Sequence, residues 1–241
     1  MMKKFLLDTH THTVASGHAY GTVTEMAKAA SEAGLKLLVI TDHGPKLPGG
    51  PHEMYFRNFR VIDREMFGVE LLMGAELNII DYNGTVDMEE SLLKKMALCI
   101  ASLHTVCLRP GTREENTRAL LGAMDNPYVR IIGHPDDGRF ELDYEAMVKE
   151  AKKHGILIEL NNSSLVSGAC RKNSPANLRK ILGLCERYGQ EIIVNTDAHF
   201  PSSVGRFGEA KSLLAECGFP EELIVNTDVE RFKKYLNSSI D

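Results

Sequence analysis

The histidines carry the clearest chemical signal in this chain, because seven of the nine lie at or after the ends of predicted strands. Two acids, Glu76 and Asp197, occupy the same kind of position. A parallel barrel brings the carboxyl ends of its strands to one face, so these side chains are expected to converge. Imidazole and carboxylate groups suit zinc, manganese and iron, so the pattern predicts a multinuclear metal site. The candidate ligands are His10, His12, His18, His43, Glu76, His104, His134, Asp197 and His199.

The two remaining histidines have simpler interpretations. His154 precedes Gly155 at the predicted end of a helix, where an imidazolium would meet the negative end of the helix dipole. His52 lies in Gly44–Arg57, a segment rich in Gly and Pro that we expect to form a long loop above the second strand. We therefore expect a structural role for His154, and a substrate contact only as an alternative for His52.

Apolar runs bounded by Gly or polar residues predict the strands that must position the candidate ligands. Several runs lack alternation, which is typical of parallel strands covered by helices on both faces. The predicted strands are Phe5–Asp8, Leu37–Thr41, Leu71–Glu76, Cys99–His104, Val129–Gly133, Ile156–Leu160 and Ile192–Thr196, with Leu223–Val225 as a weaker candidate.

Helices are predicted between these strands, where apolar residues recur at helical spacing. The helical stripes are Val23–Ala30, Tyr144–Ala151 and Leu178–Cys185, with further candidates at Asn116–Asp125 and Phe207–Cys217. Gly34, Gly155 and Gly189 each follow a helix and precede a strand, as expected of left-handed helix ends. Repeated strand and helix units predict an α/β fold. No linker interrupts them, so we predict one domain over residues 1–241.

Composition excludes several classes of protein. No stretch approaches the roughly 20 apolar residues of a membrane span, and the first residues lack a signal-peptide cleavage site. The net charge of −5 argues against binding nucleic acid through bulk charge. Five dispersed cysteines without a CxxC pair are typical of a reducing compartment, so we predict a cytoplasmic protein.

An ordered set of motifs resembles the PHP family, named for its polymerase and histidinol phosphatase members. The motifs are Asp8-Thr9-His10-Thr11-His12, Thr41-Asp42-His43, Gly74-Ala75-Glu76, His104, Gly133-His134-Pro135 and Thr196-Asp197-Ala198-His199. The resemblance covers essentially the whole chain. The stretch from Glu159 to Ser164, with Arg171 and Lys172 after it, resembles the small stand-alone bacterial phosphatases that have a three-zinc centre. The fold implied by this resemblance is a single-domain, distorted (βα)7 TIM-like barrel.

The resemblance also implies how the ligands are shared among three divalent ions, with zinc favoured over manganese or iron. In the implied assignment, His10, His12 and Asp197 bind the first metal, Glu76 bridges the first and second, His104 and His134 complete the second, and His18, His43 and His199 hold the third. Asp42, next to a ligand, is expected to orient it, although structural capping is the alternative.

The implied reaction is hydrolysis of a small phosphate monoester by a hydroxide that bridges the first two metals. Binding to metals lowers the pKa of water to about 7, so no side-chain nucleophile is needed. Glu76, Asp197 and Arg171 are the expected catalytic residues, and Arg171, Lys172 and Asn161 the expected contacts to substrate. Arg171 and Lys172 could instead be two solvated charges, and Asn161 could cap the next turn. The related small phosphatases suggest a homotrimer.

Two other kinds of protein remain as alternatives. A phosphodiesterase, nuclease or amidohydrolase could use the same metal ligands, but a nuclease would need a basic groove, and no Lys follows a predicted strand as amidohydrolases commonly require. A non-catalytic metal-binding domain is the third possibility, and the complete ligand set argues against it. The substrate itself depends on loops such as Gly44–Arg57 and Asp136–Asp143, whose specificity one sequence does not give.

Overall fold

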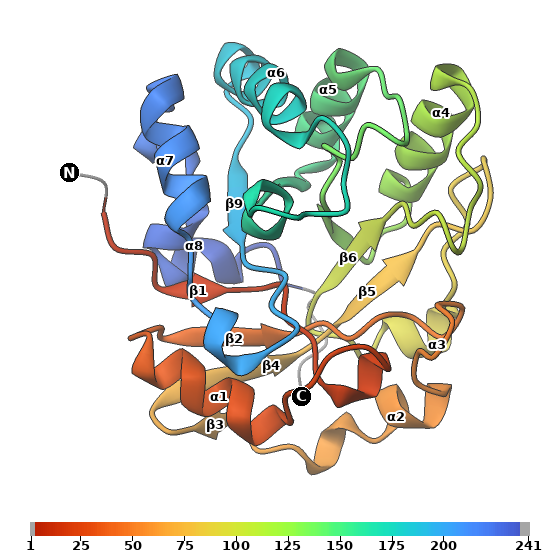
Figure 1. Cartoon of the computed structure of the whole chain (residues 1–241). Coiled ribbons are helices and arrows are strands. Elements are labelled where there is room, and N and C mark those ends of the chain that lie inside the picture. The colour runs from red at the N-terminus through yellow and green to blue at the C-terminus, as the bar shows by residue number, and fades with distance from the viewer. Residues whose placement is uncertain (1–2, 237–241) are drawn as a thin grey trace.

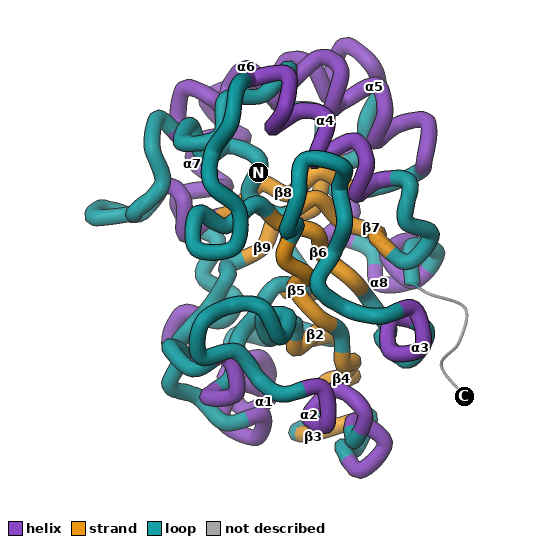
Figure 2. The backbone as a smooth tube through the Cα atoms, turned by 90° about the vertical axis from the view of Figure 1, so that its right-hand side faces the viewer, coloured by secondary structure: helices purple, strands orange, loops and turns teal. Residues whose placement is uncertain are grey.

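A barrel of parallel strands lies inside a layer of helices in the computed structural model, which describes residues 3–236 (Figures 1 and 2). The strands are β1 (Leu7–Asp8), β2 (Leu37–Ile40), β3 (Glu65–Met66), β4 (Val69–Met73), β5 (Ala75–Asn78), β6 (Cys99–Ser102), β7 (Val129–Ile132), β8 (Leu157–Asn161) and β9 (Ile192–Asn195). The α-helices are α1 (Val23–Glu32), α2 (Glu53–Arg57), α3 (Glu90–Leu93), α4 (Arg113–Met124), α5 (Tyr144–His154), α6 (Ser174–Tyr188), α7 (Gly208–Cys217) and α8 (Val229–Lys233).

The barrel wall is divided into two sheets at Gly74. One sheet has the strand order β1-β2-β4-β3 and the other β5-β6-β7-β8-β9, and only β3 runs antiparallel to its neighbour. Gly74 separates β4 from β5, which are two halves of one strand. A Cβ atom at Gly74 would lie 2.3 Å from the carbonyl oxygen of Leu98, so only glycine fits this close approach. Counted as one, β4 and β5 give seven parallel strand positions.

The last strand meets the first through side chains rather than through a regular ladder. A single bridge joins Thr11 to Ala198, beyond the ends of β1 and β9. Lower in the barrel, the buried Asn226 side chain lies between the two strands. Its Oδ1 accepts from the Val194 amide at 2.7 Å, and its Nδ2 donates to the carbonyls of Val194 at 2.7 Å and Leu7 at 3.2 Å. Asn226 therefore supplies the hydrogen bonds that a neighbouring strand would otherwise make.

The helix ends follow the signals in the sequence. At the start of α1, the Thr22 side chain accepts from the Glu25 amide while the Glu25 side chain accepts from the Thr22 amide, a capping box. Asp143 caps α5, and Gly155 and Gly189 end α5 and α6 in the left-handed conformation. These helices bury their apolar stripes against the strands and turn the chain back to the next strand, so each strand points the same way.

The predicted α/β class and TIM-like barrel are confirmed, with three local differences. Leu223–Val225 is not a strand: it lies in two short 3-10 turns and touches β9 only through a bridge between Ile192 and Ile224. The segment Gly44–Arg57 is not wholly a loop, because α2 occupies its last five residues. Glu76 lies inside β5 rather than at the end of a strand, since pairing continues to Asn78.

Within residues 3–236, no helix is both long and apolar enough to cross a membrane.

Replacing Asn226 should loosen the junction between β1 and β9. Asn226→Ala leaves three buried backbone groups without their partner, at about 1–3 kcal/mol each when no water replaces it, so we expect a loss of at least about 3 kcal/mol in the free energy of unfolding. Urea unfolding followed by circular dichroism measures this loss. The neighbouring Thr227→Ala, which removes one contact of 3.5 Å, is the control and should cost well under ~1 kcal/mol. Equal stability of the two variants would show that Asn226 does not close the barrel.

Candidate metal centre

Glu76 lies at the centre of the group of side chains that gathers at the carboxyl ends of the strands. It is fully buried on β5. One carboxylate oxygen, Oε1, faces two histidines that follow β6 and β7: it lies 2.9 Å from His134 Nε2 and 3.3 Å from His104 Nε2. Three different strands therefore bring these groups to one place.

The other oxygen of Glu76, Oε2, faces the histidines that follow β1 and β2. It lies 2.6 Å from His43 Nδ1, 3.4 Å from His10 Nε2 and 3.6 Å from His12 Nε2. Each oxygen of the carboxylate thus belongs to a separate group of imidazole nitrogens, which is the arrangement expected of a carboxylate that bridges two metal ions.

Asp197 closes the first of these groups from the loop after β9. Its Oδ1 lies 3.1 Å from His12 Nε2 and 3.6 Å from His10 Nε2. The backbone of Asp197 has φ +53°, and that of His134 has φ +26°, in the region that ordinary residues rarely adopt. Residues held in such conformations cluster at functional sites, and here the strained backbone directs two candidate ligands inward.

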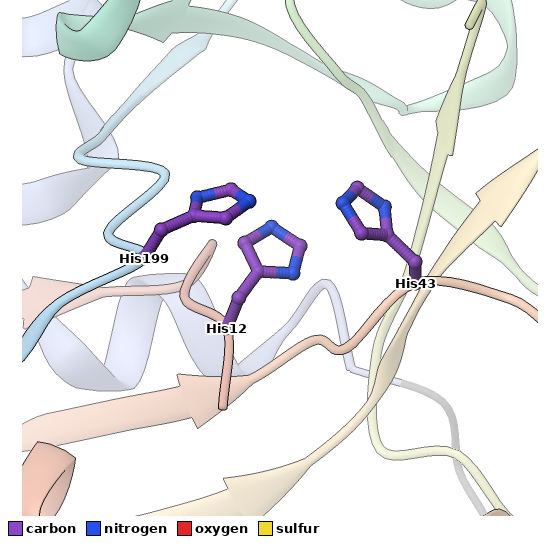
Figure 3. A group of neighbouring side chains, drawn as sticks. All are labelled: His12, His43 and His199. Carbon is purple, nitrogen blue, oxygen red and sulfur yellow. The ribbon is translucent and has the colours of Figure 1, made fainter. Parts of the chain in front are cut away.

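A third group forms around His18, His43 and His199. The Nε2 atoms of His18 and His199 lie 3.0 Å apart, although the residues are 181 positions apart in sequence. The ring centroid of His43 lies 5.0 Å from that of His18 and 5.9 Å from that of His199. Figure 3 shows the rings of His12, His43 and His199, from three separate segments, around a common space. Ligand atoms of these three all lie within 4.8 Å of one another.

Most of the histidines are oriented by a partner on the side away from this space. The Nδ1 atoms of five of them contact an acceptor: Glu159 Oε1 at 2.7 Å for His10, Ser16 Oγ at 3.1 Å for His12, the Ser16 carbonyl at 3.0 Å for His18, Asn78 Oδ1 at 2.7 Å for His104 and the Asp197 carbonyl at 2.9 Å for His199. Carbonyl and carboxylate oxygens only accept, so the proton lies on Nδ1. The Nε2 lone pair is then left free to bind a metal.

Asp42 acts on His12 through a serine. Ser16 Oγ donates to Asp42 Oδ1 at 2.6 Å, which leaves Ser16 able to accept from His12. Asp42 also accepts from the Thr13 amide and hydroxyl at 2.7 Å and from the Tyr55 hydroxyl at 2.5 Å. Burial and the neighbouring carboxylate of Asp42 raise the pKa of Tyr55, so the phenol stays protonated and donates. The expected orienting role of Asp42 has this geometry to support it.

Glu159 holds a similar position beneath His10. It is buried, and its Oε2 accepts from the His134 amide at 2.7 Å and from Asn161 at 3.1 Å. Burial opposes its charge, but the imidazole of His10 lowers its pKa below the usual value, so Glu159 is a carboxylate. Sequence reasoning included Glu159 in a motif without giving it a role, because the contact with His10 joins residues 149 apart.

Several buried nitrogen and oxygen atoms of these residues make no hydrogen bond, as expected of atoms that bind metal ions. The Nε2 atoms of His10 and His12, Nδ1 of His43 and Oε2 of Glu76 are buried and make no hydrogen bond of acceptable angle, although they lie close to one another. Buried polar groups without partners are costly, and bound cations would satisfy all four. The donor set of nitrogen and carboxylate oxygen fits zinc, manganese or iron.

A cavity of about 680 Å³ opens above these histidines. Arg171 lines it, with its side chain 13% exposed. Its Nη2 donates to Asp197 Oδ2 at 2.7 Å, and its Nη1 donates to Ser164 at 3.1 Å and Asn161 at 3.3 Å. The guanidinium is therefore placed beside the candidate ligands and is held from two sides.

The other two expected substrate contacts lie elsewhere. Lys172 is exposed and does not line the cavity. Asn161 is fully buried beneath it and donates to Glu159 and Asp197, at 3.1 and 3.2 Å. A direct contact of either residue with substrate stays a prediction.

The two remaining histidines do not join the group. His52 caps α2 by accepting from the Met54 amide, and His154 lies outside the site, beside Glu150 on the surface of α5.

Curated proteins that resemble this chain carry the name "Probable phosphatase". One from Clostridium botulinum is 48% identical over 235 residues, covering 98% of this chain and 96% of the relative. Another, from Acetivibrio thermocellus, is 46% identical and covers 97% of this chain and 95% of the relative.

Solved structures share the fold at much lower identity. A histidinol phosphate phosphatase from Lactococcus lactis, complexed with zinc, L-histidinol and phosphate, has a TM-score of 0.62 at 17% identity, covering 91% of this chain and 95% of that one. An organophosphorus hydrolase from Deinococcus radiodurans has a TM-score of 0.52 at 14% identity and covers 97% of this chain and 93% of that one. The family model described as "PHP domain" matches residues 8–236. The chain therefore belongs to the PHP domain family.

Proposed function

We propose that this protein is a metal-dependent phosphatase that hydrolyses phosphate monoesters with three divalent metal ions, of which zinc is favoured. The observation that carries the proposal is the division of the ligand atoms into three groups around Glu76 and Asp197, at the floor of a cavity that also exposes Arg171. Relatives named as phosphatases and a neighbour solved with zinc and phosphate support it.

The proposed ligand sets are those implied by the resemblance to the PHP family, and distances between side chains support them. The first ion would be held by His10, His12, Asp197 and Glu76 Oε2, the second by Glu76 Oε1, His104 and His134, and the third by His18, His43 and His199. His43 also lies 2.6 Å from Glu76, so this histidine connects the third set to the other two. The negative charge of Glu76 would offset the repulsion between neighbouring cations.

The side chains have distinct tasks in this reaction. Bound divalent ions would supply an acidified water and would polarise the phosphoryl oxygens. Glu76 would hold the ions of the first two sets and Asp197 the first ion, and Arg171 presents a planar, permanently charged donor beside these carboxylates, suited to a phosphoryl oxygen. Asp197 Oδ2 accepts from the Arg171 guanidinium, while Oδ1 faces His12. One carboxylate therefore positions Arg171 relative to the first set of metal ligands.

The cavity favours a monoester over the alternative substrates. Among the described residues that line it, there is no Lys, and the two Arg are each paired with an Asp. A nuclease would need unpaired basic groups along a groove. An amidohydrolase that uses a bridging Lys would need a Lys among the residues that line the cavity.

The trimer, the cytoplasmic location and the extent of the domain over residues 1–241 stay predictions.

Metal content and phosphatase rate, measured on one preparation, test the proposal. The wild type purified without chelator should contain about three transition-metal ions per chain and hydrolyse p-nitrophenyl phosphate. Glu76→Gln keeps the size but removes the bridging charge, so at least one ion of the first pair should be lost and the rate should fall roughly a thousandfold. The set of His18, His43 and His199 should keep its ion.

The surface variant Glu114→Gln, which lies on the outer face of α4, is the matched control and should keep all three ions. A wild type with one ion or fewer after expression with added metal would contradict the trinuclear centre. A Glu76→Gln variant with three ions and normal turnover would show that Glu76 is not the bridge.

Arg171 is expected to act on the transition state. Arg171→Ala should lower kcat/KM by about 2–4 kcal/mol, roughly 30- to 1000-fold, while metal content stays near that of the wild type because Asp197 Oδ1 remains toward His12. Arg179→Ala, which breaks an exposed ion pair with Glu216, is the control and should leave the kinetics unchanged. If Arg171→Ala has the kinetics of the wild type, Arg171 does not stabilise the transition state and only pairs with Asp197.

Glu159 should raise the affinity of the first ligand set for its metal ion by orienting His10, without binding the ion itself. Glu159→Gln removes the charge that holds the Nδ1 proton of His10, so we expect metal affinity to fall about 10- to 100-fold. Competition with a chelating dye measures the affinity. If the variant binds all ions as tightly as the wild type, His10 does not depend on Glu159.

A further inference from the structure

We infer that the leaving group of the substrate is a neutral, largely aliphatic alcohol, and that Val106 and Val166 bind it at the mouth of the cavity. This inference rests on the proposed phosphatase function, because it assumes that the phosphoryl group occupies the floor formed by the histidines. It concerns the rest of the cavity, which must accept whatever is attached to the phosphate.

Two loops form the walls on which this inference rests. One follows β6 and contributes Leu103 and Val106, and the other follows β8 and contributes Val166 and Ala169. Leu47, from the segment after β2, lines the cavity as well. These side chains are apolar, whereas the floor consists of imidazoles and a carboxylate.

The valines at the mouth are unusually exposed for their type. Val106 is 64% exposed and Val166 is 42% exposed, so both leave apolar surface in contact with water at the entrance. Covering that surface with a ligand group would gain free energy in proportion to the apolar area buried. Binding cavities are usually lined by apolar side chains with a few polar groups that fix orientation, as here.

The charged groups of the wall are already neutralised by one another. Asp137 is 4% exposed, and the Arg139 guanidinium contacts it through both Nε and Nη2, at 2.8 and 2.5 Å. Arg171 is paired with Asp197. Among the described residues lining the cavity away from the histidine floor, these are the charges, so a second phosphate, a carboxylate or an ammonium on the leaving group would find no unpaired partner.

The wall also lacks a surface for stacking a nucleobase. Of the described residues that line the cavity, none is Phe, Tyr or Trp, and the chain contains no Trp. Proteins that hold bases usually stack them on aromatic side chains. Thr105, Ser163 and Ser167 provide a few hydroxyl groups, enough to orient a small alcohol but few for a polyol.

Non-hydrolysable phosphonates test the inference without the influence of leaving-group reactivity. The inhibition constants of methyl-, propyl- and 3-methylbutylphosphonate are measured against p-nitrophenyl phosphate with the zinc-loaded enzyme. Each added methylene should tighten binding about two- to fourfold. 3-Phosphonopropanoate, which has the shape of 3-methylbutylphosphonate but a carboxylate, should bind at least about fivefold more weakly, as should 3-aminopropylphosphonate compared with butylphosphonate.

Calorimetry of the same phosphonates gives a readout independent of turnover. The heat capacity change of binding should become more negative as the alkyl chain lengthens, because apolar surface is buried. A flat series, or tighter binding of the carboxylate or ammonium compound, would overturn the inference. An enzyme that does not hydrolyse p-nitrophenyl phosphate at all would instead contradict the proposed function, so the two failures are distinguishable.

Serine variants assign the effect to the two valines. Val106→Ser and Val166→Ser should each reduce the preference for 3-methylbutyl- over methylphosphonate at least about twofold. Val61→Ser, at a position that is 63% exposed but does not line the cavity, is the matched control and should keep the preference of the wild type. If both variants at the mouth retain that preference, the valines do not bind the leaving group.

Discussion

The burial of the Glu76 carboxylate is the constraint on which the site depends. A charge with no exposed surface costs several kcal/mol unless it is paired, and its neighbours at 2.6–3.6 Å are imidazole nitrogens rather than lysine or arginine. Imidazoles neutralise a carboxylate fully only when they carry protons, whereas the outer hydrogen bonds of His10, His12 and His104 leave the Nε2 lone pairs of these three toward it. The arrangement becomes favourable when cations lie between the nitrogens and the carboxylate. The same residues that would destabilise an empty core therefore offer the donor atoms that a metal centre needs.

Histidine lone pairs such as that of His10 point toward Glu76 because side chains from other strands hold the imidazole rings from the opposite side. His10 is oriented by Glu159 from β8, and Glu159 in turn is held by the His134 amide and by Asn195 from β9. Asp8, whose pKa burial raises to about 6, accepts from the Thr196 hydroxyl across the junction of β1 and β9. The geometry of the candidate ligands is thus linked to closure of the barrel, and the Asn226 side chain supports the candidate metal centre by holding β1 against β9.

The sequence was sufficient to predict which residues converge, because the carboxyl ends of parallel strands share one face whatever the details of packing. His18 and His199 illustrate this, since their Nε2 atoms meet although the loops that carry them belong to opposite ends of the chain. It was not sufficient for contacts that depend on side-chain direction across strands. Ser16, Tyr55 and Asn226 carry no motif, and their partners lie 4 to 219 residues away. Leu223–Val225 has the composition of a strand, but Asn226 takes the place of the pairing that a strand would need.

The floor and the walls of the cavity obey different physical requirements, and Arg171 lies where they meet. Floor residues are fixed by strand position, outer hydrogen bonds and strained backbone at His134 and Asp197, so small displacements there would disturb several candidate ligands at once. Wall residues such as Val106 and Val166 lie on loops and contact solvent. Arg171 comes from a wall loop but is anchored on Asp197 of the floor. A protein built in this way can keep the chemistry of phosphoryl transfer constant while its loops determine which alcohol accompanies the phosphate.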